Sequence, residues 1–158
     1  MEITVRKELI RCENCKRIKS FYYLSEFMYG KRLVFSEDAS PLAFIDLIDD
    51  KVYGDYIERI KKILEKNNRS YETKDMDSFI ERTFGETCDS IDNKKIEFTL
   101  TQKKCVYCGS AKFERNMIEP AKEEKIDLPV ISHIEWNKLS DIQKEEEIIR
   151  KLRRECLL

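Results

Sequence analysis

The residues with the clearest chemistry are four cysteines in two Cys-x-x-Cys pairs, Cys12 with Cys15 and Cys105 with Cys108. Two intervening residues let one tight turn aim both sulfurs at a single ion, and four thiolates make the tetrahedral site that Zn²⁺ prefers. Gly109 directly follows the second pair and suits the left-handed backbone of such a turn. We expect one zinc ion per chain, structural because no ligand position is left for water.

The two pairs resemble the knuckles of zinc-ribbon proteins, in which two such turns, each between strands, clamp one Zn²⁺. The resemblance covers the knuckles and their flanking strands, which is under half of the chain. The spacing departs from the pattern, because 89 residues separate the pairs where about 15–20 is familiar. Closing the longer loop costs about 1.4 kcal/mol more, which is small beside the roughly 10–16 kcal/mol of structural zinc sites in peptides.

Other chemistries remain open for the same cysteines. A rubredoxin-like iron centre uses the same turns, and the pairs could also form two separate sites or bridge two chains. Thioredoxin-type redox chemistry needs a helix that starts at the motif. Here Lys16 and Arg17 follow the first pair, Gly109 and Ser110 follow the second, and strands are expected around both.

Composition predicts a globular protein in a reducing compartment. The chain has 158 residues, 41% of them hydrophobic, and its 30 basic and 31 acidic residues nearly cancel, which argues against a polyanion binder. The start carries no signal-peptide pattern, and no apolar run approaches the roughly 20 residues that cross a bilayer. We expect a cytoplasmic protein whose thiols are reduced. Abundant Ile and Lys with few Ala is typical of AT-rich bacterial or phage genomes.

The elements that must position the cysteines are strands. In residues 2–11, apolar and polar residues partly alternate and several are β-branched, a pattern that predicts a strand. This segment leads directly into the Cys12–Cys15 pair. Residues 19–35 fit one or two further strands. The segment 95–103 alternates apolar and polar residues and leads into the second pair, and 111–118 leaves it. Together these segments predict a small antiparallel sheet.

The sequence between the expected strands at 19–35 and 95–103 carries patterns that predict helices. Ser40 and Pro41 combine a capping residue with proline at the first helical position, which predicts a helix start. Apolar residues from Tyr53 to Leu64 recur at three- and four-residue spacing and predict a helix. A shorter helix is expected over residues 77–83.

The last forty residues are expected to form a linker and a helix. Residues 120–129 are charged and predict a linker. Ser140 with Gln143 forms a capping box for a helix that runs to about Arg154. Its apolar stripe is expected to pack on its own domain, although it could dock on a partner.

The fold class predicted is α+β, a zinc-ribbon antiparallel sheet with an inserted helical region and a C-terminal helix. Residues 1–40 and 94–119 form the split ribbon, 41–93 the helical insertion, and 120–158 the linker and amphipathic helix. The insertion holds 13 acidic and 8 basic residues, whereas the two ribbon parts together hold 14 basic and 9 acidic residues. A basic metal-binding module thus carries an acidic insertion.

No catalytic constellation is visible along the sequence. His133 is the single histidine, and no adjacent Ser, Cys or carboxylate supports a triad, so we expect a hydrogen-bonded structural residue. Cys88 and Cys156 are isolated and fit small buried hydrophobes. The prediction is therefore a non-enzymatic protein-interaction factor, such as a bacterial or phage-encoded regulator, inhibitor or immunity-type protein. Its partner would meet the acidic insertion or the C-terminal helix.

The alternative is a nucleic-acid-binding accessory protein that uses the basic face of the ribbon. Basic residues near aromatic ones could hold phosphates while the rings stack on bases, although lysines also protect sheet edges. The candidate residues are Lys16, Arg17, Lys19, Lys103, Lys104, Lys112 and Arg115.

Overall fold

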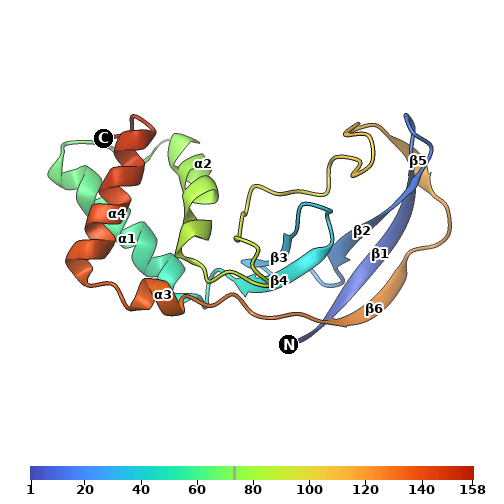
Figure 1. Ribbon diagram of the computed structural model, residues 1–158, viewed down its shortest axis with the longest axis horizontal. Helices are drawn as coiled ribbons and strands as arrows, with labels where there is room; N and C mark the ends of the chain where they lie inside the picture. Colours follow the sequence, from blue (N-terminus) through green and yellow to red (C-terminus); the bar gives the residue numbers. More distant parts are fainter. Residues whose placement is uncertain (73) are drawn as a thin grey trace. The chain divides into compact units, whose positions relative to one another are not determined.

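The computed structural model describes residues 1–72 and 74–158 of the chain. They form two compact units, each built from two segments of the sequence. Met1–Ile45 with Leu100–Val130 make the sheet unit, and Asp46–Thr99 with Ile131–Leu158 make the helical unit. Antiparallel sheets and helices inserted between strands confirm the α+β prediction (Figure 1).

The main sheet of the sheet unit is organised around one long strand, β1 (Glu2–Cys12). The strand β2 (Ile18–Leu24) pairs antiparallel with one edge of β1. On the other edge, β5 (Phe113–Met117) pairs near the end of β1 and β6 (Lys122–Asp127) near its start (Figure 1). The expected strands at 2–11 and 111–118 are confirmed. In the expected range 19–35, β2 begins one residue early, at Ile18, and ends at Leu24.

A second, two-stranded sheet consists of β3 (Lys31–Phe35) and β4 (Pro41–Asp46). Alternating apolar residues of β1 and residues of this hairpin share one apolar core, which fixes the register of both elements. The buried members of this core are Ile3, Val5, Leu33, Phe44 and Leu128.

The helical unit contains α1 (Lys51–Lys66), α2 (Lys74–Thr83), the 3₁₀ helix η1 (Phe84–Thr87), α3 (Ile134–Asn137) and α4 (Asp141–Arg154) (Figure 1). Asp50 caps α1 by accepting from the Tyr53 N–H at 2.8 Å. The predicted capping box of Ser140 and Gln143 is confirmed at the start of α4.

Aromatic side chains fill the interior of the helical unit. The Phe84 ring contacts Tyr53, Tyr56 and Phe98, and Trp136 packs edge-on against Tyr56. Such ring pairs add stabilisation beyond the apolar area that they bury. The core of this unit is therefore built largely from packed aromatic rings.

The helix expected to start at Ser40 and Pro41 is wrong, because this segment forms β4. The turn before it is held by Ser36 N–H donating to the Ser40 carbonyl at 3.0 Å, and proline is acceptable as the first residue of a strand. Phe44 N–H donates to the Pro129 carbonyl at 3.0 Å, which extends the pairing of β4.

The strand expected over 95–103 is also wrong, although its alternation is real. Ile96 and Phe98 are both buried, and the chain at Ile96 lies directly against Gly85. Farther on, the Gln102 side chain bonds both the N–H and the carbonyl of Tyr22, each at 2.5 Å. One amide side chain thus takes the place of a paired strand at this point of β2.

The linker expected over 120–129 is wrong in its centre, which forms β6. Ile126 pairs with Ile3, and the charged residues of β6 lie beside β1 from Glu2 to Lys7. Because β6 contributes few apolar residues, its strand state depends on the partner strand and leaves little signal in its own sequence.

Candidate metal centre

The first Cys-x-x-Cys pair forms the turn between β1 and β2. Cys12 is the last residue of β1, and its N–H donates to the Arg17 carbonyl at 2.9 Å while its carbonyl accepts from the Lys16 N–H at 3.0 Å. Lys16 adopts a left-handed backbone with φ of 62°, a conformation that costs a non-glycine residue about 1–2 kcal/mol.

The second pair repeats the same backbone pattern at equivalent positions. Cys105 N–H donates to the Ser110 carbonyl at 2.8 Å, and Gly109 N–H donates to the Cys105 carbonyl at 2.8 Å. Gly109 has a φ of 75°, which confirms the expected use of glycine at this position. The two knuckles therefore share one geometry, with Lys16 in the place of Gly109.

Strand pairing brings the two knuckles together. Cys12 pairs with Phe113 of β5, and Glu13 N–H donates to the Lys112 carbonyl at 3.0 Å, so the second knuckle docks beside the first. The predicted convergence of the two pairs is confirmed.

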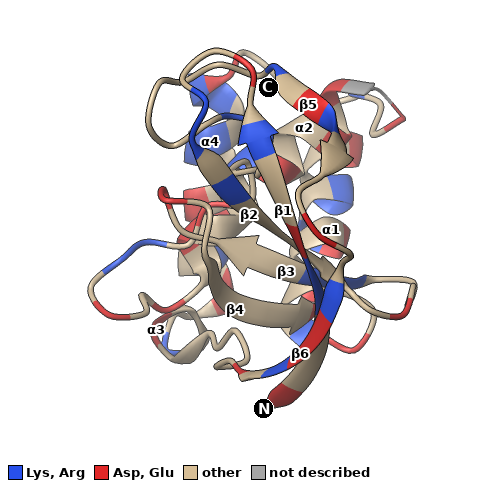
Figure 2. Ribbon diagram, turned by 90° about the vertical axis from the view of Figure 1, so that its right-hand side faces the viewer, with Lys and Arg blue, Asp and Glu red and all other residues tan. Residues whose placement is uncertain are grey.

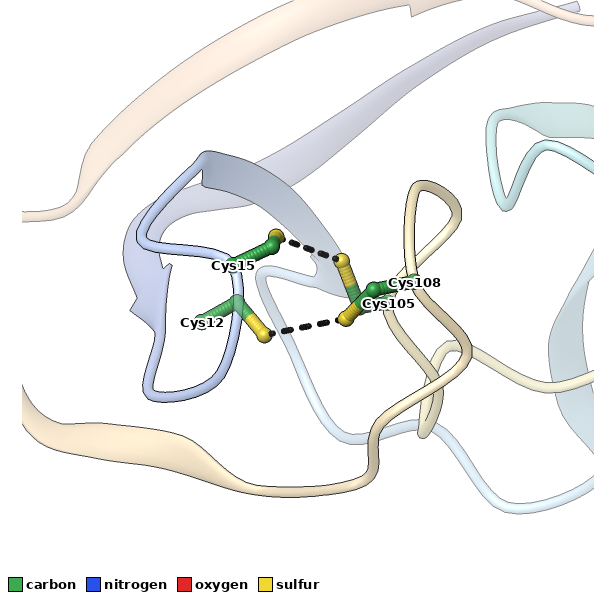
Figure 3. A group of neighbouring side chains, drawn as sticks. All are labelled: Cys12, Cys15, Cys105 and Cys108. Carbon is green, nitrogen blue, oxygen red and sulfur yellow. Dashed lines mark hydrogen bonds between the residues drawn. The ribbon is translucent and has the colours of Figure 1, made fainter.

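The four sulfurs form one compact group (Figure 3). Cys12 Sγ lies 3.7 Å from Cys108 Sγ, and Cys15 Sγ lies 3.6 Å from Cys105 Sγ. All four lie within 4.8 Å of one another, so the group could hold a metal ion. Cys12 and Cys105 are buried, whereas Cys108 is exposed, which places the group at the surface of the sheet unit.

The surroundings favour the thiolate at one knuckle and oppose it at the other. A hydrogen bond from the Asn14 side chain, aided by the Ser110 N–H, lowers the pKa of Cys108 to about 6. The Arg17 N–H lowers the pKa of Cys15, but burial and the three neighbouring thiols outweigh it and raise this pKa to about 11. A bound cation is therefore needed to hold all four sulfurs deprotonated at neutral pH.

The predicted basic residues fall into two groups. Lys16, Arg17, Lys103, Lys104, Lys112 and Arg115 are exposed. Lys19 is buried, and its ammonium donates to the Gln102 carbonyl and lies 4.2 Å from the centre of the Phe21 ring. Burial lowers the pKa of Lys19, and the nearby Cys105 partly restores it. Lys19 thus acts as an internal counter-charge to the thiols.

The knuckles also contact each other through side chains. The Arg17 guanidinium lies 4.7 Å from the centre of the Tyr107 ring, a cation–π contact from the first knuckle to the second. Sequence reasoning missed Gln102 and Lys19 as supports of the site. Their signal was weak, because Lys and Gln within expected strands are the residue types most often exposed to solvent.

The other candidates, His133, Cys88 and Cys156, belong to the helical unit. His133 is buried and hydrogen-bonded, in keeping with a structural role. Cys88 is half-buried and Cys156 is exposed, so neither is the fully buried small hydrophobe that was expected.

No family model matches this chain, and no match was found among the curated proteins or the solved structures. Among the described residues, no helix has the length and apolar character needed to cross a membrane.

Proposed function

We propose that the four cysteines hold one Zn²⁺ ion with a structural role. Four sulfurs around a tetrahedral zinc at about 2.3 Å lie about 3.8 Å apart. The Cys12–Cys108 and Cys15–Cys105 Sγ–Sγ distances of 3.7 and 3.6 Å fit this spacing, and all four sulfurs lie within 4.8 Å of one another. The bound ion would offset half of the charge of the four thiolates and cross-link the two segments of the sheet unit.

Metal analysis of the purified chain tests this proposal. We expect one zinc per chain, and its loss when Cys105 is replaced by Ser. A content near zero, or near two, would contradict a single shared zinc site, and iron in its place would favour the rubredoxin-like alternative.

We further propose that the chain is a non-enzymatic protein-interaction factor, of the regulator, inhibitor or immunity-protein class. The observation that carries this is the loop between β2 and β3, where Phe27 and Tyr29 are 93% and 81% exposed and Met28 lies between them. Large apolar side chains held in water at adjacent positions are typical of binding surfaces, and aromatic residues dominate binding energy at interfaces.

A groove beside the β2–β3 loop further supports this loop as the surface that binds a partner. It measures about 560 Å³ and is lined by Tyr22, Tyr23, Phe27 and Phe35 among others. By contrast, Ile148 and Leu152 of α4 are buried within the helical unit. We therefore place the partner on the β2–β3 loop and its groove, and not on the apolar stripe of α4.

A second candidate function is nucleic-acid binding through the knuckles. Lys and Arg residues lie along β1, β2 and β5 (Figure 2). Six of the predicted basic residues are exposed, and the Tyr107 ring beside Arg17 is 56% exposed. Exposed rings beside cations are the means by which single strands are bound without sequence preference.

One set of variants separates the two functions. Phe27→Ala combined with Tyr29→Ala should abolish capture of a specific protein partner in a native pull-down, whereas Ile142→Ala, an exposed apolar residue of α4, should leave it unchanged. Charge reversal of Lys16, Arg17, Lys103 and Lys104 should leave that capture intact. A salt-dependent shift of single-stranded nucleic acid, lost on charge reversal, would instead favour the second function.

A further inference from the structure

The edge of β2 that faces away from β1 is an incomplete strand edge. Ser25 N–H donates to the Thr4 carbonyl at 3.2 Å, in line with the antiparallel register of β1 and β2. In such a pair, residues bonded to the partner strand alternate with residues whose N–H and carbonyl point the other way. Tyr22 and Leu24 therefore direct their backbone groups away from β1.

The Gln102 side chain shows which kind of group this edge accepts. Its amide bonds both the N–H and the carbonyl of Tyr22, as the backbone of a neighbouring strand would. Leu24 is the next residue with outward backbone groups. In the described part of the chain, no strand pairs with this edge of β2 and no group bonds the Leu24 N–H or carbonyl. The edge is thus covered at Tyr22 and open at Leu24.

The open end of the edge lies at the groove beside the β2–β3 loop, because Leu24 and Gln102 both line this groove. Its two sides differ in character. Leu24 and Phe35 pack against the apolar core of the sheet unit. On the opposite face of the sheet, Arg6 pairs with Tyr23, and its guanidinium lies 5.3 Å from the centre of the exposed Tyr23 ring. An added strand would place its side chains alternately on these two faces.

The charge of the groove indicates which side chains that strand would carry. Three cations, Arg6, Lys31 and Arg32, line the groove, against the single carboxylate of Glu26. This excess of positive charge favours an acidic segment over a basic one.

We propose that the protein partner docks through an extended segment that adds to β2 at Leu24 and alternates apolar with acidic residues. The proposal rests on the interaction function proposed above and names the form of the partner. Backbone hydrogen bonds to Leu24 supply affinity, and the alternate side chains supply specificity. The apolar residues lie against Leu24 and Phe35, and the carboxylates lie towards Arg6.

The test begins with a display library of short linear peptides, selected on the purified, metal-loaded chain. We expect the selected peptides to alternate apolar residues with Asp or Glu. Labelled copies are then titrated with two variants, and fluorescence anisotropy measures their affinity. Leu24→Pro removes the outward N–H, which proline tolerates at a strand edge, whereas Leu24→Ala loses side-chain packing and keeps this donor. Leu24→Pro should bind about tenfold more weakly than Leu24→Ala.

A second measurement uses the wild-type chain alone, so that it does not depend on the folding of a variant. A selected peptide is N-methylated at every second residue, in each of the two possible phases. Only one phase faces β2, so one methylated peptide should lose binding and the other should keep it. Equal effects of the two phases, equal affinities of Leu24→Pro and Leu24→Ala, or selection of basic peptides would each overturn the proposal.

Two further outcomes would overturn the proposal and leave the interaction function standing. The first is a protein partner that is lost with Phe27→Ala and Tyr29→Ala but captured equally by Leu24→Pro and Leu24→Ala. The second is a dimer in light scattering that Leu24→Pro dissociates and Leu24→Ala keeps, which would assign the edge to a second copy of this chain. Capture that does not depend on Phe27 and Tyr29 would instead contradict the interaction surface itself.

Discussion

The two units of this chain are stabilised in different ways. In the sheet unit the four-cysteine group joins segments 89 residues apart, beside an apolar core that includes Ile3, Val5 and Phe44. In the helical unit the Phe84 ring lies among Tyr53, Tyr56 and Phe98. If the cysteines hold a metal as proposed, the two units should respond to different perturbations.

Replacing Cys105 with Ser should have the largest effect. Structural zinc in peptide sites contributes roughly 10–16 kcal/mol, which exceeds the stability of most single domains. Hydrogen exchange should become fast in β1, β2 and β5 while α1 and α4 stay protected. A chelator should reproduce this pattern. Equal loss of protection in both units would refute the division.

Gly85→Ala should damage the helical unit selectively. A Cβ at Gly85 would lie 2.1 Å from the Ile96 carbonyl oxygen, so backbone must move, at a cost of about 1–3 kcal/mol. The thermal midpoint followed by Trp136 fluorescence should fall, and the zinc content should not.

Gly54→Ala is the matched control for Gly85→Ala. No atom lies within 4 Å of a Cβ at Gly54 in α1, so alanine should stabilise the helix by about 0.5–1 kcal/mol. If both glycine variants shift the midpoint equally, the Ile96 contact does not limit the stability of this unit.

The pH dependence of the two units should be opposite. Unfolded His133 loses its proton near pH 6.5, whereas the folded residue keeps it to about pH 10. The folded state therefore binds more protons between these values, and the free energy of unfolding of the helical unit should fall as pH rises through this window. Full linkage would give about 5 kcal/mol, and solvent screening of the ion pair between His133 and Asp50 reduces this to on the order of 2 kcal/mol.

Urea unfolding of the helical unit at several pH values, followed by Trp136 fluorescence, measures this slope. His133→Gln should make the free energy of unfolding of the helical unit nearly independent of pH between 6.5 and 10, because glutamine does not titrate. The sheet unit should instead weaken in acid, because protons compete with the metal for the thiolates. A helical unit that gains stability between pH 6.5 and 10 would contradict the ion pair.

The smallest effect should come from the two left-handed knuckle positions. Lys16→Gly removes the strain of a φ of 62° and should stabilise the sheet unit by about 1 kcal/mol. Gly109→Ala, at a φ of 75°, should cost a similar amount although no neighbour blocks the Cβ. Chelator titration of each variant measures the change, and two shifts of the same sign would contradict the shared knuckle geometry.

Local signals allowed much of this architecture to be predicted. The Cys-x-x-Cys turns, the alternation in β1 and the capping box of Ser140 and Gln143 each depend on residues close in sequence. The errors have one physical cause, which is dependence on distant residues. The strand state of β6 comes from β1, the Gln102 side chain replaces a strand beside β2, and Asp50 meets His133 only in the folded chain.

The chain passes between the two units three times, after Ile45, Thr99 and Val130. Neither unit can be completed from an uninterrupted stretch of sequence. The first knuckle lies in a local hairpin, yet its metal site needs Cys105 and Cys108 as well, and α1 packs against α4. Because long loops must close before their contacts stabilise anything, folding should be slow for a chain of this length. Until both pairs have met, Cys12 and Cys15 supply only two of the four sulfurs, so complete metal binding should come late in folding.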